Sequence, residues 1–182
     1  DATVAALADA LVEHKVLFFR DQSLTTEQHL AFGRRFGQLE VHPFTEAAPG
    51  YLENLRGYEE VFVLESTAER PAVANNWHSD VTWRVDPSLG SILHCLVAPE
   101  YGGDTVWADM AAAHDGLDDA TQRQLSSLVA IHDWHAFRNS MRRRGLPEDR
   151  IAALEKEFPP VEHPVVRTHP VSKRKVIYVN AP

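Results

Sequence analysis

The feature that most constrains this chain is the run Asn76-Trp77-His78-Ser79-Asp80, in which a histidine and an aspartate stand two residues apart. In an extended strand, residues two apart point to the same face of the sheet. The spacing therefore predicts that the His78 imidazole and the Asp80 carboxylate face one point. Such a pair is most of the two-histidine, one-carboxylate triad that holds non-haem Fe(II). A His-x-Asp spacing is common by itself, so the rest of the chain has to support this interpretation.

The composition is typical of one soluble globular domain. The chain has 182 residues, of which 44% are hydrophobic and 24% charged, enough for a sizeable core. Its net charge of -8 argues against a nucleic-acid or anionic-membrane partner. The single cysteine, Cys95, excludes an intramolecular disulfide. No apolar run is long enough to span a membrane, and no signal-peptide pattern opens the chain, so we expect a cytoplasmic protein. We also expect a homo-oligomer.

Polar caps and helical periodicity predict several helices. Asp1 is placed to cap the first helix, which we expect to end near His14. Thr25 and Gln28 form a capping-box pattern at the start of a second helix, which we expect to end at Gly37. Further helices are predicted after Asp109 or Asp118 and after Pro147.

Short apolar runs between these helices predict strands. The predicted strands are residues 16–19, 61–64, 91–97, 105–107, 161–167 and 176–179, the last two around a turn at residues 170–173. Helices and strands do not alternate regularly, which disfavours a doubly wound parallel sheet. The pattern favours instead a β-sandwich or jelly roll with helices packed outside it.

Five stretches stand out in order along nearly the whole chain. They are Leu17-Phe18-Phe19-Arg20-Asp21-Gln22, Arg35-Phe36-Gly37, Asn76-Trp77-His78-Ser79-Asp80-Val81-Thr82, Gly102-Gly103-Asp104-Thr105-Val106-Trp107 and His163-Pro164-Val165-Val166-Arg167-Thr168-His169-Pro170. Together they resemble the taurine dioxygenase-like family of Fe(II)/2-oxoglutarate-dependent dioxygenases. The resemblance implies a mainly β fold with outer helices, the double-stranded β-helix (jelly roll, cupin-like). It further implies that residues 1–182 form a single dioxygenase domain, incomplete at the C-terminus.

The same resemblance implies a set of site residues. His78 and Asp80 become ligands of Fe(II), and the Thr105 hydroxyl contacts a carboxylate oxygen of the cosubstrate 2-oxoglutarate. His42 and Asn76 are the expected substrate contacts. The second histidine ligand and an arginine that grips the far carboxylate of 2-oxoglutarate are expected beyond residue 182.

The implied activity is hydroxylation of a small organic substrate (a sulfonate, sulfate ester or carboxylate) with O2, releasing succinate and CO2. Thr45 and Ala74 stand where the taurine-specific members carry a tyrosine and an asparagine, which weakens taurine as the substrate. Trp77 and Trp83 flank the metal pair. They supply either a dry shell around the metal or ordinary core packing, and both interpretations stay open.

The other histidines are expected to be structural. His94 lies in an apolar run, and His163 and His169 each precede a proline, which favours extended backbone. His132 and His135 share a face only if their stretch is helical, and a helix there would waste Ile131.

Two other functions compete with the oxygenase. A zinc hydrolase would need a further ligand and a positioned base, and the chain has no His-Glu-x-x-His motif. The second alternative is a non-catalytic binding protein on the same fold with an incomplete metal site.

Overall fold

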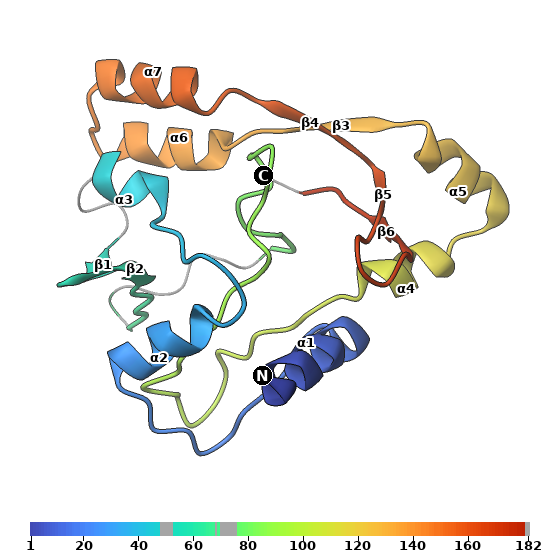
Figure 1. The fold of residues 1–182 in the computed structure, drawn as a ribbon. Helices are drawn as coiled ribbons and strands as arrows, with labels where there is room; N and C mark the ends of the chain where they lie inside the picture. Colours follow the sequence, from blue (N-terminus) through green and yellow to red (C-terminus); the bar gives the residue numbers. More distant parts are fainter. Residues whose placement is uncertain (48–52, 68, 70–75, 181–182) are drawn as a thin grey trace. The chain divides into compact units, whose positions relative to one another are not determined.

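The computed structural model describes residues 1–47, 53–67, 69 and 76–180. Two compact units emerge: unit 1 comprises residues 1–38, 90–129 and 164–178, and unit 2 comprises residues 39–89, 130–163 and 179–182. Figure 1 labels the helices and strands. Their bounds are α1 Ala2–His14, α2 Thr26–Gly33, α3 Pro43–Ala47, β1 Asn54–Leu55, β2 Tyr58–Phe62, α4 Met110–Asp115, α5 Asp119–Ser126, β3 Val129–His132, α6 His135–Arg143, α7 Glu148–Glu157, β4 Val161–Pro164, β5 Val166–Thr168 and β6 Lys175–Ile177.

The predicted helix caps are confirmed. Asp1 caps α1, and Thr25 with Gln28 forms the reciprocal bonds of a capping box at the start of α2. The sequence predicted either Asp109 or Asp118 as a helix cap, and both residues are caps. Asp109 caps α4 and Asp118 caps α5. In each case a side-chain oxygen accepts hydrogen bonds from the first backbone N–H groups, which have no partner within the helix.

Several predicted boundaries were wrong. α2 ends at Gly33 rather than at Gly37, because residues 34–36 close into a turn. In the described part of the chain, residues 16–19, 91–97 and 105–107 form no strand. A strand persists only where a neighbour completes its backbone hydrogen bonds, and none of these runs has such a neighbour among the described strands. The strand predicted at 61–64 lies slightly earlier, as β2.

The described strands form three separate two-stranded sheets, β1–β2, β3–β4 and β5–β6, rather than one jelly-roll sheet. The predicted hairpin near the end of the chain is confirmed: β5 and β6 pair antiparallel, with Arg167 opposite Val176. Lys173 completes its turn with a positive φ of 60°. The expected mixture of helices and strands is therefore present, in short sheets.

Unit 2 is built around an aromatic core. The Phe44 and Trp83 rings stack with centroids 5.0 Å apart and planes 9° apart. Trp134 is 1% exposed, and its Nε1–H donates to the Phe158 carbonyl over 2.7 Å. The neighbouring helices α6 and α7 contribute Met141, Ile151 and Leu154 to the same cluster. This core supports the segment that carries His78 and Asp80, since the core residue Trp83 lies three residues after Asp80 in the chain.

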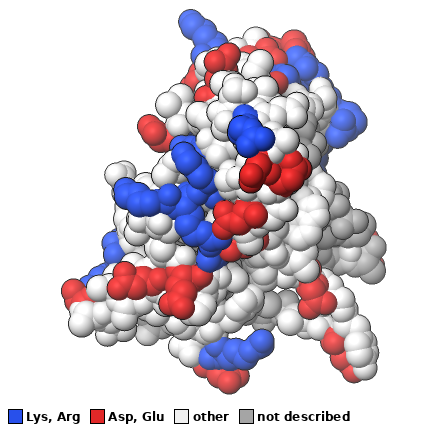
Figure 2. Space-filling view, turned by 90° about the vertical axis from the view of Figure 1, so that its right-hand side faces the viewer, with Lys and Arg blue, Asp and Glu red and all other residues white. Residues whose placement is uncertain are grey.

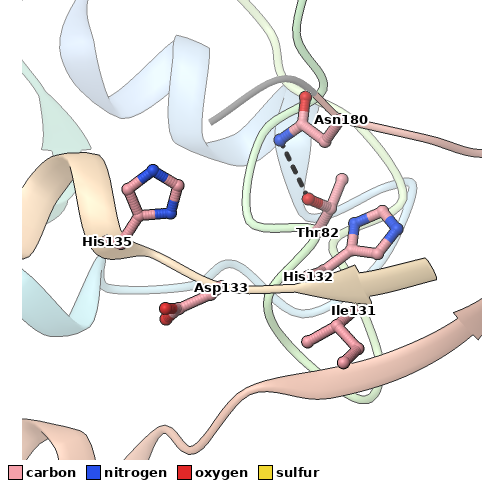
Figure 3. A pocket seen from close by; sticks show the side chains of 6 residues that line it. All are labelled: Thr82, Ile131, His132, Asp133, His135 and Asn180. Atoms are coloured by element: carbon pink, nitrogen blue, oxygen red, sulfur yellow. Dashed lines mark hydrogen bonds between the residues drawn. The ribbon is translucent and has the colours of Figure 1, made fainter.

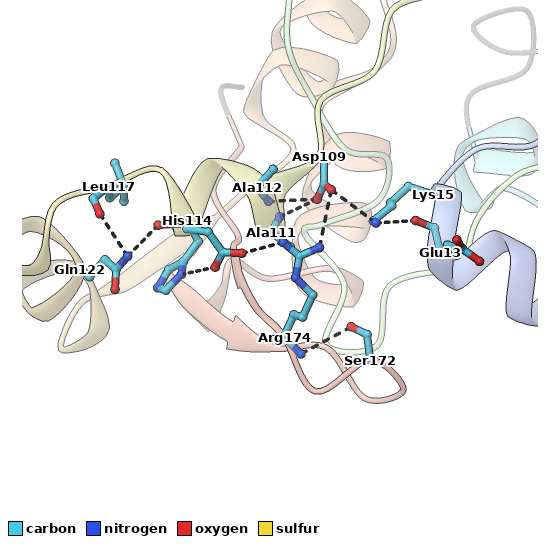
Figure 4. A network of polar contacts seen from close by, with 11 residues as sticks. Glu13, Lys15, Asp109, Ala111, Ala112, His114, Leu117, Gln122, Ser172 and Arg174 are labelled. Atoms are coloured by element: carbon cyan, nitrogen blue, oxygen red, sulfur yellow. Dashed lines mark hydrogen bonds and ion pairs between the residues drawn. The ribbon is translucent and has the colours of Figure 1, made fainter.

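Unit 1 is tied together by polar contacts (Figure 4). Asp109 pairs with Lys15 at the end of α1 (3.4 Å) and with Arg174 before β6 (3.8 Å). Arg174 also bonds Asp115 (2.6 Å), whose other oxygen lies 3.5 Å from Nδ1 of the buried His114. The network thus connects α1, α4 and the β5–β6 hairpin.

On the face shown in Figure 2, Lys and Arg side chains lie beside Asp and Glu side chains in several places. Among the described residues, no helix combines the length and apolar character needed to cross a membrane.

Candidate active site

His78 and Asp80 converge in unit 2. Nε2 of His78 lies 3.5 Å from Oδ1 of Asp80, and the two side chains are 42% and 75% exposed. The predicted strand is wrong here: residues 77–79 are irregular and residues 80–83 form a turn. The turn includes Val81 at a positive φ of 48°. The two side chains therefore face one point without a regular strand between them.

The orientation of His78 suits a metal ligand. Its Nδ1 lies 2.9 Å from the Asn76 carbonyl oxygen, which can only accept a hydrogen bond. Nδ1 therefore donates to this carbonyl, and Nε2 is the ring nitrogen that faces Asp80. A carbonyl partner on the second ring nitrogen is the usual way in which proteins orient a ligating histidine.

The distance between the two side chains also fits a shared ion. Two ligand atoms that each lie about 2.1 Å from one metal are about 3.0–3.4 Å apart for angles between a right angle and a tetrahedral angle. The observed 3.5 Å between Nε2 and Oδ1 is close to that range. One neutral imidazole and one carboxylate form a nitrogen–oxygen set that suits Fe(II). Among the described residues, no third His, Cys, Asp or Glu joins them to complete a metal-binding group.

His42, the expected substrate contact, is held among aromatic rings just before α3. Its imidazole packs against Phe44, Phe62, Trp83 and Phe137, with centroids 5.2–6.5 Å away. Burial lowers the pKa of His42 from the usual 6.5, although the negative charge of Asp80 acts in the opposite direction.

The proton of His42 can be placed on one ring nitrogen. Nδ1 accepts a hydrogen bond from the Phe44 N–H over 3.2 Å. The neutral ring therefore keeps its proton on Nε2, which is left as a hydrogen-bond donor. A neutral donor in an aromatic surrounding can orient an anionic oxygen of a small molecule.

The side chains of the remaining predicted site residues have no hydrogen bond to His78 or Asp80 among the described contacts. The Asn76 side chain is exposed, and its backbone carbonyl serves His78 instead. The Thr45 hydroxyl donates to the His42 carbonyl over 2.7 Å. Ala74 lies outside the described residues. Thr105 is exposed in an irregular segment of unit 1, so its contact with 2-oxoglutarate stays a prediction.

The two flanking tryptophans differ. Trp83 is 4% exposed and belongs to the aromatic core, whereas Trp77 is 63% exposed. The core interpretation is therefore correct for Trp83, and Trp77 belongs neither to a core nor to a dry shell in the described part of the chain.

The other histidines take structural places. His163 on β4 is buried, with Nε2 3.0 Å from the carbonyl oxygens of Thr82 and Arg84. The strand predicted for His169 is wrong, because this residue lies in a turn where its Nδ1 accepts from Val171 and Ser172 N–H. His94 is half-buried beside His29 in a segment that is not a strand.

A small cavity of about 60 Å³ lies beside the turn of residues 80–83 (Figure 3). It is lined by Thr82, Ile131, His132, Asp133, His135 and Asn180. His132 lies on a strand rather than a helix, as expected, and its ring meets His163 edge-on at 5.0 Å. No site role was predicted for Thr82, which ends the motif at residues 76–82, or for Asn180, which follows the predicted strand at residues 176–179.

Comparisons with known proteins match the chain throughout its length. A profile of the family described as "Taurine catabolism dioxygenase TauD, TfdA family" matches residues 1–182. An alkylsulfatase of Acinetobacter baylyi is 36% identical over 181 residues, covering 96% of this chain and 53% of the relative. An alpha-ketoglutarate-dependent sulfate ester dioxygenase of Pseudomonas putida is 35% identical over 181 residues, covering 97% and 57%.

A solved structure shows the same similarity. The crystal structure of AAD-2 in complex with Mn(II) and N-oxalylglycine superposes with a TM-score of 0.68 at 31% identity, covering 97% of this chain and 59% of that chain. The chain therefore spans somewhat more than half the length of these relatives.

Proposed function

Because the chain belongs to the taurine catabolism dioxygenase TauD, TfdA family, we propose that the protein is an Fe(II)- and 2-oxoglutarate-dependent dioxygenase. The observation that carries the proposal is the convergence of His78 Nε2 and Asp80 Oδ1 at 3.5 Å, with the His78 ring oriented by a backbone carbonyl. The similar AAD-2 structure contains Mn(II), which supports a divalent metal in this fold.

The overall reaction balances without a further reductant. One substrate C–H bond becomes C–OH, while 2-oxoglutarate and O2 become succinate and CO2. Bound Fe(II) would supply the oxidising chemistry. The residues of this chain would hold the metal through His78 and Asp80 and would orient the substrate through His42. The Thr105 hydroxyl is proposed to hold 2-oxoglutarate by a hydrogen bond.

The fold is proposed to be a double-stranded β-helix formed as a single domain. The separate two-stranded sheets would then be parts of it, completed by the portion of the relatives' length that this chain does not span. The second histidine ligand and the arginine for 2-oxoglutarate are proposed to lie in that portion.

A small organic anion is the proposed substrate, with alkyl sulfate esters preferred over sulfonates and carboxylates. The two curated relatives described above, an alkylsulfatase and a sulfate ester dioxygenase, support this order. Thr45 argues against taurine in particular. Its hydroxyl is engaged with the His42 carbonyl, whereas the taurine-specific members carry a tyrosine at this position. His42 would donate from Nε2 to an anionic oxygen of the substrate.

The test is a substrate screen with matched variants. The full-length protein is loaded with Fe(II) without oxygen, and succinate is measured after oxygen is added with an alkyl sulfate, an alkyl sulfonate, taurine or an aryloxyacetate. We expect the alkyl sulfate to stimulate succinate release most. His78→Ala and Asp80→Ala should abolish the stimulation, whereas His14→Ala on α1 and the exposed Asp86→Ala should not. Succinate at the wild-type level from Asp80→Ala would refute the assignment. Binding of an anion without any succinate would favour the non-catalytic alternative.

A further inference from the structure

The side chain of Asn180 forms hydrogen bonds with Ser79 and Thr82, which are about 100 residues earlier in the chain and next to the proposed metal ligands. Its Oδ1 accepts the Ser79 N–H over 3.0 Å, and its Nδ2 donates to the Ser79 carbonyl over 3.1 Å. The same Nδ2 donates to the Thr82 hydroxyl over 3.0 Å, the bond drawn in Figure 3. Both hydrogens of the amide nitrogen are thereby used, so the three bonds fix which end of the amide is oxygen.

Two of these hydrogen bonds lie on the backbone that connects the two proposed metal ligands. Ser79 stands between His78 and Asp80, so its N–H belongs to the peptide unit after His78. Its carbonyl belongs to the peptide unit before Asp80. One side chain therefore holds both peptide units that connect the two proposed ligands. A movement of either ligand's backbone would lengthen at least one of the bonds to Asn180.

The turn needs external support because its backbone is strained. Val81 has a φ of 48°, a left-handed conformation that a β-branched residue rarely adopts. Such a conformation persists only where the surroundings impose it. Asn180 supplies contacts on one side. His163 supplies others, because its Nε2–H lies 3.0 Å from the carbonyls of Thr82 and Arg84.

We propose that Asn180 is a positioning residue for the metal site, fixing the separation of His78 and Asp80 through Ser79 and Thr82 before the metal binds. The proposal rests on the function proposed above. Asn180 does not contact the metal itself. A preformed pair of ligands loses less conformational freedom on binding, so removing Asn180 should weaken metal affinity while leaving the aromatic core of unit 2 unchanged.

The first test compares metal affinity in the full-length protein. Mn(II) binding is measured by the loss of the free-ion EPR signal for wild type, Asn180→Ala, Asn180→Asp and Asn139→Ala, with thermal midpoints recorded in parallel. Asn180→Asp keeps the size and the acceptor oxygen but loses the donor. Asn139 is an exposed asparagine on α6 and serves as the matched control. We expect both Asn180 variants to bind Mn(II) about 10–100-fold more weakly, the range for residues that orient metal ligands. Asn139→Ala should match wild type.

A second pair of variants keeps the test decisive if the Asn180 variants do not fold. Thr82→Ser keeps the hydroxyl that Asn180 reaches, and Thr82→Val removes it. We expect Thr82→Ser to bind Mn(II) like wild type and Thr82→Val to bind several-fold more weakly at an unchanged thermal midpoint. If Asn180→Ala folds and binds Mn(II) as tightly as wild type, the positioning role is overturned. If Asn180→Ala does not fold, equal Mn(II) affinities of Thr82→Ser and Thr82→Val overturn it instead. Either result leaves the proposed function intact. A wild-type protein that binds no Mn(II) or Fe(II) would overturn both.

Discussion

The two units bury their apolar residues to very different extents. In unit 2, six buried residues form one cluster around Phe44, Trp83 and Trp134. In unit 1, the segment of residues 92–97 leaves Leu93 68%, Leu96 82% and Val97 88% exposed. Burial of apolar surface is the main source of folding free energy. The difference indicates that unit 2 carries the larger apolar core, whereas the polar network around Asp109 adds contacts between the elements of unit 1.

The comparison also explains where the proposed site is well formed. His42, His78 and Asp80 all belong to unit 2, close in sequence to core residues of the cluster. Thr105 belongs to the exposed stretch of unit 1. Exposed apolar side chains in such number are unusual on a monomeric soluble protein.

Two tryptophan substitutions, one in each unit, should show the difference in core packing most clearly. Trp134→Ala in unit 2 should lower the free energy of unfolding by about 3–5 kcal/mol, because it empties a fully packed site. Trp107→Ala in unit 1 removes a side chain that is 50% exposed and touches Phe18 edge-on. It should cost about 1 kcal/mol. Urea unfolding of the 182-residue chain measures both, and equal losses would show that the exposed segment is packed after all.

Removing the cap of α4 tests whether polar contacts hold unit 1. Asp109→Ala should cost about 1 kcal/mol, because Ala111 and Ala112 lose the acceptor of their N–H groups. Asp109→Asn keeps a capping oxygen but loses the charge that meets Lys15 and Arg174, so it should cost less. The free energy of unfolding is measured in urea at low and at high salt. The deficit of Asp109→Asn should shrink in high salt, where surface ion pairs are screened. A loss of unfolding free energy that is the same at low and high salt would show that the ion pairs of Asp109 do not stabilise unit 1.

Of these predicted effects on the free energy of unfolding, the one from protonation of His42 should be the smallest. Burial lowers its pKa in the folded state below the usual 6.5. The unfolded chain therefore takes up a proton first as the pH falls. Stability is full above about pH 6.5 and declines between that value and the lower folded pKa. His42→Gln should remove this part of the pH dependence. The NMR chemical shifts of the ring report the folded pKa directly, and a midpoint at or above 6.5 would contradict the buried, neutral state.

Local signals in the sequence were sufficient for the helices. Caps such as Asp1 and Thr25 act on backbone groups two or three residues away, so their pattern is visible without the fold. The strands were harder, because residues 91–97 have strand composition but need a partner from elsewhere to complete their backbone hydrogen bonds. Composition does not reveal whether that partner is present.

The site was predictable in part. The approach of His78 and Asp80 to one point was predicted, although the strand expected to produce it is absent and residues 80–83 form a turn. Asn180 could not be found, since it bonds Ser79 across 101 residues of sequence. An asparagine three residues after β6 has many ordinary roles, and only the fold shows which backbone groups it bonds.

The most direct measurement of the central claim is an anaerobic Fe(II) titration of the full-length protein and of its His78→Ala and Asp80→Ala variants. Wild type should bind one Fe(II) per chain. Each variant should bind it more than about 100-fold more weakly, a loss beyond that of a residue which only orients a ligand. Fe(II) binding by Asp80→Ala at the wild-type affinity would show that the two side chains do not share a metal ion.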